Sequence, residues 1–230
     1  MKKFVLVLTF IILVSGFAFA EFQLEPSFGW FFNIDDYDGA TKRTFNGLNT
    51  NITLRYFFIE NIGLFFGGDF KAWFSAYNDN YINQLQSNEM QVIIDNDTGY
   101  KLDLFFGLSL AYSINYNFGI QWDLGLSATV WSTESIIGTM KNVVYDISTD
   151  IFIDKIYSMG FYYSIFGNYF LGSIGNIKSY LTFGARIDYK FNRDETVEVV
   201  TDGISQEYSG KKTNFSGFAI TPSIGYMGSF

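Results

Sequence analysis

Cysteine and histidine do not occur in this sequence of 230 residues. Without cysteine, the chain cannot form a disulfide framework, a thiolate metal site or a lipid anchor attached to cysteine. Without histidine, it cannot use a Ser–His–Asp mechanism, because the imidazole is the proton acceptor in that mechanism. We expect neither a cofactor nor a metal site in this chain.

Proline is rare, at 2 residues, whereas aromatic side chains make up 20% of the sequence, with 27 Phe and 16 Tyr. This composition favours β-sheet over disordered structure. Beyond residue 20 there is no run of about 18 apolar residues, so no membrane-spanning helix is predicted there. The mean hydropathy is nevertheless positive. The apolar residues must therefore be distributed in a pattern other than that of a membrane-spanning helix.

Residues 1–20 have the pattern of a cleavable signal peptide. Lys2 and Lys3 supply the positive start, an apolar run follows, and Ala18-Phe19-Ala20 forms a small-x-small cleavage site before Glu21. The alternative is an uncleaved anchor, but the apolar run is short for a span of about 20 residues. The sequence predicts export, with residues 21–230 as one domain.

Acidic residues outnumber basic ones, 23 to 15. Removal of the signal peptide would take Lys2 and Lys3 away and move the formal net charge from −8 to −10. Because phosphate binding needs a basic surface, we expect no nucleic-acid partner.

The last stretch of the chain, Phe218 to Phe230, alternates large apolar residues with small or weakly polar ones. A period of two residues indicates a strand. Seven earlier segments show the same alternation at a length that could cross a bilayer, about 9–11 residues or more. The eight predicted strands are Phe22–Phe32, Leu48–Phe58, Ile62–Phe74, Leu102–Tyr116, Ile120–Trp131, Ile156–Leu171, Ile177–Phe191 and Phe218–Phe230.

The connections between these segments alternate in length. Those near 59–61, 117–119 and 172–176 are short, whereas 33–47, 75–101, 132–155 and 192–215 are long and polar. Short turns on one side and long loops on the other are typical of transmembrane barrels. The strands of a soluble β-sandwich would also alternate between polar and apolar residues. The signal peptide, the outward aromatic residues and the asymmetry of the connections favour the transmembrane barrel over the sandwich. The predicted fold is an all-β, eight-stranded antiparallel up-and-down transmembrane barrel.

Two of the long connections contain further strand character. Asp202-Gly203 is a hairpin signal within Glu195 to Tyr208. We expect the last two strands to project beyond the membrane there as a two-stranded flap. Gln91 to Ile94 with Asn96 to Gly99 could form a small separate hairpin in the second long loop.

Alternate side chains of each predicted strand point into the barrel, and the charged side chains fall on these inward-pointing positions, which we call the inward phase. The outward-pointing positions, the outward phase, carry almost no charge. Buried charges must be paired or solvated, so four cations and five anions on one side predict a network of ion pairs in the lumen. A catalytic carboxylate pair such as Asp69 with Asp103 is the alternative. The predicted lumen charges are Glu25, Arg55, Asp69, Lys71, Asp103, Asp123, Arg186, Asp188 and Lys190.

Outward aromatic residues gather near the strand ends, which predicts two belts at the membrane interfaces. Large aromatic residues also occur on the inward phase, at Phe31, Phe57, Phe65, Phe105, Phe166, Trp73 and Trp131. The predicted interface residues are Phe22, Trp30, Tyr56, Tyr116, Trp122, Tyr189, Tyr226 and Phe230.

With its signal peptide, eight alternating segments and terminal Phe230, the chain resembles the small bacterial outer-membrane β-barrels of the OmpA transmembrane domain, OmpX and OmpW type. The resemblance implies an outer-membrane location in contact with its lipids. It also implies recognition of the C-terminal strand by the barrel-assembly machinery. Gly228, where a bulky outward residue is common, departs from that terminal pattern.

Three functions remain open from the sequence. A scaffold with a lumen plugged by side chains, displaying loops to an extracellular ligand, fits the width of an eight-stranded barrel. A narrow channel for small or apolar solutes is supported by the inward aromatic residues. The third function, a membrane enzyme, has no recognisable set of catalytic residues in this chain. Outer-membrane phospholipase, lipid A deacylase and omptin-like protease mechanisms resemble one another in using a histidine, and this chain has none.

Overall fold

The computed structural model describes residues 21–37, 41–77, 90–142, 146–201, 204–212 and 215–230. The expected signal peptide lies outside the described residues. The strands are β1 (Glu21–Tyr37), β2 (Thr41–Ile59), β3 (Ile62–Tyr77), β4 (Met90–Ser113), β5 (Phe118–Asn142), β6 (Asp146–Ile174), β7 (Ile177–Lys190), β8 (Arg193–Thr201), β9 (Ile204–Lys212) and β10 (Phe215–Ser229).

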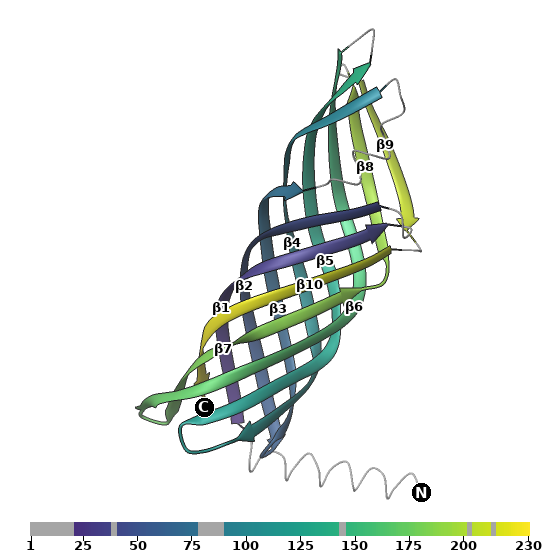
Figure 1. Ribbon diagram of the computed structural model, residues 1–230. Coiled ribbons are helices and arrows are strands. Elements are labelled where there is room, and N and C mark those ends of the chain that lie inside the picture. Colours follow the sequence, from purple (N-terminus) through teal and green to yellow (C-terminus); the bar gives the residue numbers. More distant parts are fainter. Residues whose placement is uncertain (1–20, 38–40, 78–89, 143–145, 202–203, 213–214) are drawn as a thin grey trace, which may run out of the picture.

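Eight of these strands close into a barrel (Figure 1). Each pairs antiparallel with its neighbours in the order β5-β4-β3-β2-β1-β10-β7-β6, and β6 returns to β5. Closure pairs the backbone groups of every strand on both sides, which an open sheet cannot do. The predicted eight-stranded up-and-down barrel is confirmed.

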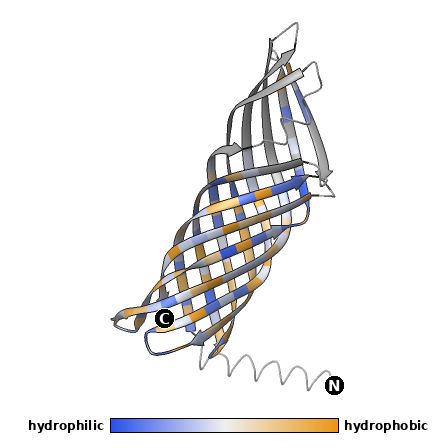
Figure 2. Cartoon of the chain, viewed as in Figure 1, coloured by the Kyte–Doolittle hydropathy of each residue, from blue (hydrophilic) through white to orange (hydrophobic). Residues whose placement is uncertain are grey.

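Side chains alternate between the two faces of this wall. In β10, Phe218, Ile220 and Ile224 are exposed, whereas Ala219 and Thr221 are buried. Figure 2 shows hydrophobic and hydrophilic positions alternating along the strands of the barrel. The alternation places large apolar residues outside and polar residues in the lumen.

The chain's only two prolines, Pro26 and Pro222, stand on the strands that close the ring. The pairing of β1 with β10 is interrupted twice, once at each proline. Residues 25 and 26 of β1, which include Pro26, have no partner on β10. Residues 30 and 31 of β1, which lie opposite Thr221 and Pro222, have none either. Each proline lacks an N–H, so each removes a hydrogen bond from this seam. Both remain paired on their other sides, with Ile52 and Ala185.

The expected long loops are wrong for most of their length. The strands continue through them, so that β4, β5 and β6 extend well above the shorter β1, β2 and β3 (Figure 1). The predicted separate hairpin within 91–99 is also wrong, because these residues belong to β4 and pair with β5 from Met90 opposite Asn142. At the other end β4 stops at Ser113, so Tyr116 lies in the turn and not in a strand.

The predicted hairpin is confirmed, but it does not stand alone as a two-stranded flap. β8 and β9 pair from Arg193 opposite Lys212 to Thr201 opposite Ile204. β8 also pairs with β6, from Asp194 opposite Tyr157 to Thr201 opposite Thr149. The upper parts of β4, β5 and β6 together with β8 and β9 therefore form a five-stranded sheet above the ring, which we call the projecting sheet.

Short turns join the strands at the opposite end as predicted, although the one expected near 117–119 covers residues 114–117 because β5 begins at Phe118. Ile59 pairs with Ile62, and Ile174 pairs with Ile177 across a turn in which Gly175 has a φ of 60°. That backbone conformation favours glycine. The chain ends there too, since the Phe230 backbone N–H donates to Phe22 O at 2.8 Å.

Candidate functional site: the filled lumen

The lumen gathers the charged side chains that the sequence places on the inward phase. All nine of them, from Glu25 to Lys190, are at most 6% exposed. They come from six of the eight ring strands, and they form two clusters at different heights with an aromatic layer between them.

Arg55 is the centre of the lower cluster. Its Nη1 lies 2.6 Å from Glu25 Oε2 and its Nη2 lies 2.7 Å from Asp123 Oδ2, while Nε donates to Asp123 Oδ1 at 3.1 Å. Ser109 and Ser164 donate to the two oxygens of Asp123 at 2.6 and 2.8 Å. A guanidinium that is held by two carboxylates and further hydrogen bonds is well compensated for its burial.

Below this cluster, three amide side chains connect opposite walls. Gln121 on β5 donates to Gln23 on β1 at 3.1 Å, and Asn168 donates to Gln121 at 3.1 Å. β1 and β5 stand four positions apart in the eight-membered ring, so this contact crosses the lumen. Gln23 and Gln121 are both buried, and their part in closing the lumen was not predicted from the sequence.

Arg186 lies beside the closing seam. It donates to Ser27 at 2.5 Å and to Ser223 at 2.8 Å, its guanidinium stacks 4.7 Å from the Phe166 ring, and it is 3.8 Å from Glu25. Its Nε has no hydrogen-bond partner among the described residues. Arg186 is therefore the least completely paired of the predicted lumen cations.

The aromatic layer consists of Phe65, Phe105 and Tyr162. The rings of Phe105 and Tyr162 are stacked with centroids 4.3 Å apart and planes within 8°. Phe65 packs against both at 5.9 and 5.5 Å. A Cβ atom on Gly67 would lie 2.4 Å from the Phe105 ring, so a residue without a side chain is needed beside it. This layer fills the barrel at mid-height.

The upper cluster joins two lysines to three aspartates. Lys71 Nζ lies 3.0 Å from Asp69, 3.1 Å from Asp103 and 3.6 Å from Asp188. Lys190 Nζ lies 3.4 Å from Asp188 and 3.5 Å from Asp103.

Neutral partners complete this cluster. Asn49 donates to Asp69, Thr129 donates to Asp103 at 2.5 Å, and Ser127 donates to Asp188 at 2.5 Å. Asp69 and Asp103 are thus joined through one ammonium group. They are therefore ion-paired and do not form an isolated carboxylate pair.

A second aromatic group, Phe31, Phe45 and Trp73, is buried above the upper cluster. The predicted inward position of Trp131 is wrong, since this side chain is 49% exposed. The register shifts by one residue between Leu102, which faces Trp131, and Asp103, which faces Thr129. This bulge places Val130 and Trp131 both outside and returns Ser132 to the lumen.

Three charged residues at the upper end were assigned to loops from the sequence. Arg193 lies 3.3 Å from Asp35 and 5.6 Å from the Phe215 ring. Lys101 lies 5.7 Å from the Phe45 ring. Continuing the alternation of the neighbouring strands a few residues further would have placed Asp35 and Lys101 inside.

Of the predicted interface aromatics, Phe22, Tyr56, Tyr226 and Phe230 lie near the short-turn end of the ring, whereas Trp30 pairs with Leu48 in the middle of β1 and β2. Tyr226 donates to or accepts from Ser179 at 2.6 Å, and the rings of Phe22 and Tyr56 are 4.8 Å apart. Contact of these residues with lipid headgroups stays a prediction. Tyr56 and Trp122 are half-buried, and the exposed ones are Phe22, Trp30, Tyr116, Tyr189, Tyr226 and Phe230.

No family model and no curated protein matches this sequence. Among solved structures, a major outer membrane protein from Thermus thermophilus aligns with a TM-score of 0.56 over 92% of this chain and 99% of its own, at 13% identity. The chain has the fold of the small outer-membrane β-barrels. The resemblance predicted from the sequence is confirmed at the level of the fold.

Two further solved structures align over most of the chain. Neisserial surface protein A (NspA) has a TM-score of 0.41 at 12% identity, over 90% of this chain and 95% of that one. The outer membrane protease OmpT from Escherichia coli has a TM-score of 0.40 at 8% identity, over 92% and 96%. In the parts of the chain that the structure describes, no helix is long and apolar enough to cross a membrane.

Proposed function

We propose that this protein is an integral outer-membrane barrel that serves as a structural scaffold, with a lumen closed by its own side chains and a projecting sheet for contacts outside the cell. The outward surface of the ring supports membrane insertion. Large apolar side chains stand exposed all around it, among them Leu54, Phe66, Phe106, Leu124 and Phe161. A surface this apolar is suited to hydrocarbon and not to water.

The filling of the lumen is the observation that carries the scaffold role. Side chains bridge opposite walls at two heights, through Gln121 with Gln23 and through Lys71 with Asp188. Between these levels stand the Arg55 cluster and the stacked rings of Phe105 and Tyr162. An eight-stranded barrel has an interior only wide enough for side chains, and here those side chains interlock.

Single-channel recording in planar bilayers tests this proposal. We expect no stable conductance from the unmodified protein. The double variant Arg55→Ala with Asp123→Ala removes the charged connection between β2 and β5, and it should produce openings that the unmodified protein lacks. Lys178→Ala, at an exposed position near the turn, is the matched control and should stay silent. A steady conductance from the unmodified protein would favour the narrow channel instead.

We also propose that the protein is not an enzyme. Each lumen carboxylate of the two clusters contacts a cation: Glu25 and Asp123 contact Arg55, and Asp69, Asp103 and Asp188 contact Lys71. A general base needs access to a substrate, and these groups are buried and already engaged. Loss of a hydrolytic activity on substitution of Asp69 or Asp103 with asparagine, in an assay of the purified protein, would contradict this.

The projecting sheet is the proposed surface for an extracellular ligand. Among the described residues, β4 between Met90 and Thr98 pairs only with β5, and β9 pairs only with β8. Such edges carry backbone groups that can pair with a further strand. Replacing residues 196–209 with a short turn removes the β8–β9 hairpin and leaves the ring. Cells carrying this variant should lose binding of the ligand while the barrel still assembles, and unchanged binding would exclude the hairpin.

A further inference from the structure

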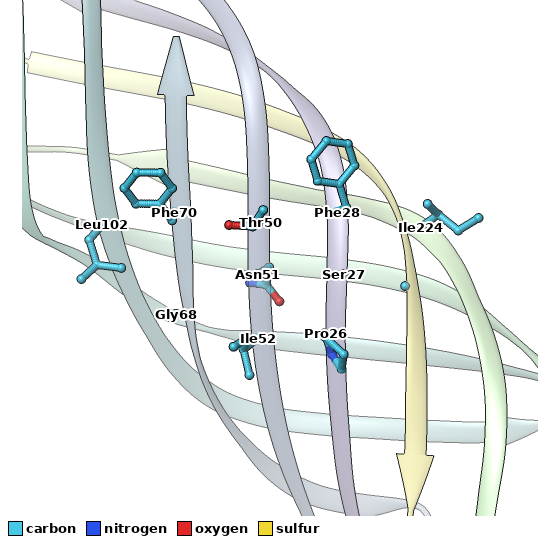
Figure 3. A pocket seen from close by; sticks show the side chains of 11 residues that line it. Pro26, Ser27, Phe28, Thr50, Asn51, Ile52, Gly68, Phe70, Leu102 and Ile224 are labelled. Atoms are coloured by element: carbon cyan, nitrogen blue, oxygen red, sulfur yellow. The ribbon is translucent and has the colours of Figure 1, made fainter.

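The outer wall of the ring has a hollow of about 610 Å³, in a surface that otherwise bears large side chains. It crosses β10, β1, β2, β3 and β4 (Figure 3). Ile224, Phe28, Thr50, Phe70 and Leu102 face one another in register across these five strands. Four strand spacings make this row roughly 19 Å long. We call this hollow the outer groove.

Large outward side chains bound the outer groove, among them Ile52, which is 58% exposed, and smaller residues lie between them. Figure 3 shows the rings of Phe28 and Phe70 on either side of Thr50. The neighbouring row runs from Pro26 through Ile52 to Gly68. No charged side chain lines the groove, and Thr50 is its only polar side chain that points outward, since Ser27 and Asn51 are buried in the wall.

Gly68 is the residue that makes the floor hollow, and packing does not require a glycine there. A Cβ atom on Gly68 would lie 3.5 Å from Leu104 Cδ2 and 3.8 Å from Asp103 O, which are ordinary contacts. The inward neighbour Gly67 differs, because a Cβ atom there would collide with Phe105. Glycine inside a strand is unfavourable, and close approach of a ligand is one reason for a glycine where the wall does not demand it.

We propose that the outer groove binds one acyl chain of a membrane phospholipid. This inference rests on the proposed membrane location, since the groove is continuous with the outward apolar surface of the ring. A phospholipid chain reaches about half of a hydrocarbon core that is roughly 30 Å thick, so it fits within the roughly 19 Å that the row of lining residues spans. A second barrel is a poorer occupant, because its convex wall would meet Phe28 and Phe70 before reaching Gly68.

Lipid retention tests the proposal. The refolded protein is reconstituted in liposomes of palmitoyl-oleoyl phosphatidylethanolamine and phosphatidylglycerol and then extracted in mild detergent. Phospholipid that remains bound is counted by native mass spectrometry. We expect the unmodified protein to retain one phospholipid, and Gly68→Leu to reduce this retention about tenfold, which corresponds to the loss of roughly ten carbon–carbon contacts.

The matched control is Ala185→Leu, which adds a similar outward side chain on β7, four positions around the ring from Gly68 on β3. It should retain lipid like the unmodified protein. Thr50→Leu fills the same floor from β2 and should repeat the Gly68→Leu result if that variant does not fold. Folding is checked by the heat-dependent shift of the barrel band on gels.

Equal retention by the unmodified protein, Gly68→Leu and Thr50→Leu would overturn the proposal, as would a dimer in place of a lipid adduct. Flotation of the liposomes separates this failure from failure of the proposed function. Protein that floats with the liposomes but shows no groove-dependent retention contradicts only the acyl-chain site. Protein that does not float contradicts the membrane location and the site together.

Discussion

Lys71 Nζ lies 3.6 Å from Asp188 Oδ2, on the opposite side of the barrel. β3 and β7 are four positions apart in the ring of eight, so this ion pair spans the full width of the lumen. The same ammonium group also contacts Asp69 and Asp103, its neighbours on β3 and β4. One side chain therefore contacts three carboxylates and connects two walls.

Removing this ammonium group should destabilise the barrel strongly. Lys71→Met keeps a side chain of similar length but leaves three buried carboxylates with fewer cations. Breaking a buried ion pair by removing one partner costs about 3–5 kcal/mol. We expect a loss of this size in the free energy of unfolding, measured by urea titration in liposomes with tryptophan fluorescence. Lys178→Met, at an exposed position, should change the free energy little, and equal effects of the two would contradict the network.

A substitution at Tyr162 should raise the free energy of unfolding, whereas the substitution at Lys71 lowers it. Its hydroxyl is buried and has no hydrogen-bond partner among the described residues, while its ring stacks on Phe105. An unsatisfied buried polar group costs about 1–3 kcal/mol. Tyr162→Phe should therefore raise the free energy of unfolding by about 1 kcal/mol, whereas Tyr162→Ala should lower it by about 3–5 kcal/mol through loss of the ring. A destabilising Tyr162→Phe would mean that the hydroxyl has a partner.

The fold could be predicted because lipid and lumen impose opposite demands on alternate residues. This contrast holds only within the ring. Above it, residues 90–101 and 132–142 show no clean alternation of apolar and polar residues, although the chain stays extended. Residues 33–37, 90–101 and 132–142 were assigned to loops for this reason, and they are strands.

One inserted residue explains the wrong position of Trp131. Alternation assigns a side by counting, so a bulge inverts every assignment beyond it. The bulge at Val130 has no turn residue that would announce it. It is visible only in the pairing of β5 with β4, where Trp131 faces Leu102 and Thr129 faces Asp103.

The alternation of inward and outward residues predicted which charged side chains lie in the lumen, but it did not predict which of them contact one another. Which inward residues meet depends on the tilt and stagger of the strands, which the sequence of one strand does not specify. Arg55 thus contacts Asp123, 68 residues away, and Lys71 contacts Asp188 across the lumen. Both pairs needed the closed ring to become apparent.

The membrane location can be tested by comparing how much an outward-facing arginine lowers the free energy of unfolding at two positions, one on the ring and one on the projecting sheet. Leu124 is 61% exposed on the ring, and Ile204 is 67% exposed on the β8–β9 hairpin of the projecting sheet. In water, arginine at either position would be tolerated. In a bilayer, Leu124→Arg should cost about 2–4 kcal/mol in the free energy of unfolding from liposomes, and Ile204→Arg about 0–1 kcal/mol. Equal, small costs would show that Leu124 does not face hydrocarbon.

The terminal aromatic ring should matter for assembly in cells more than for stability. Phe230 joins the seam through its backbone, which donates to Phe22 O at 2.8 Å and accepts from Phe22 N at 3.3 Å, and its side chain is 57% exposed. Phe230→Ala keeps both hydrogen bonds. If the barrel-assembly machinery reads this ring, the variant should refold into liposomes like the unmodified protein but reach the outer membrane in lower yield. We would measure heat-shifted barrel per cell against refolded fraction in liposomes, with exposed Tyr116→Ala as the control. Equal losses in both measurements would assign Phe230 a role in stability alone.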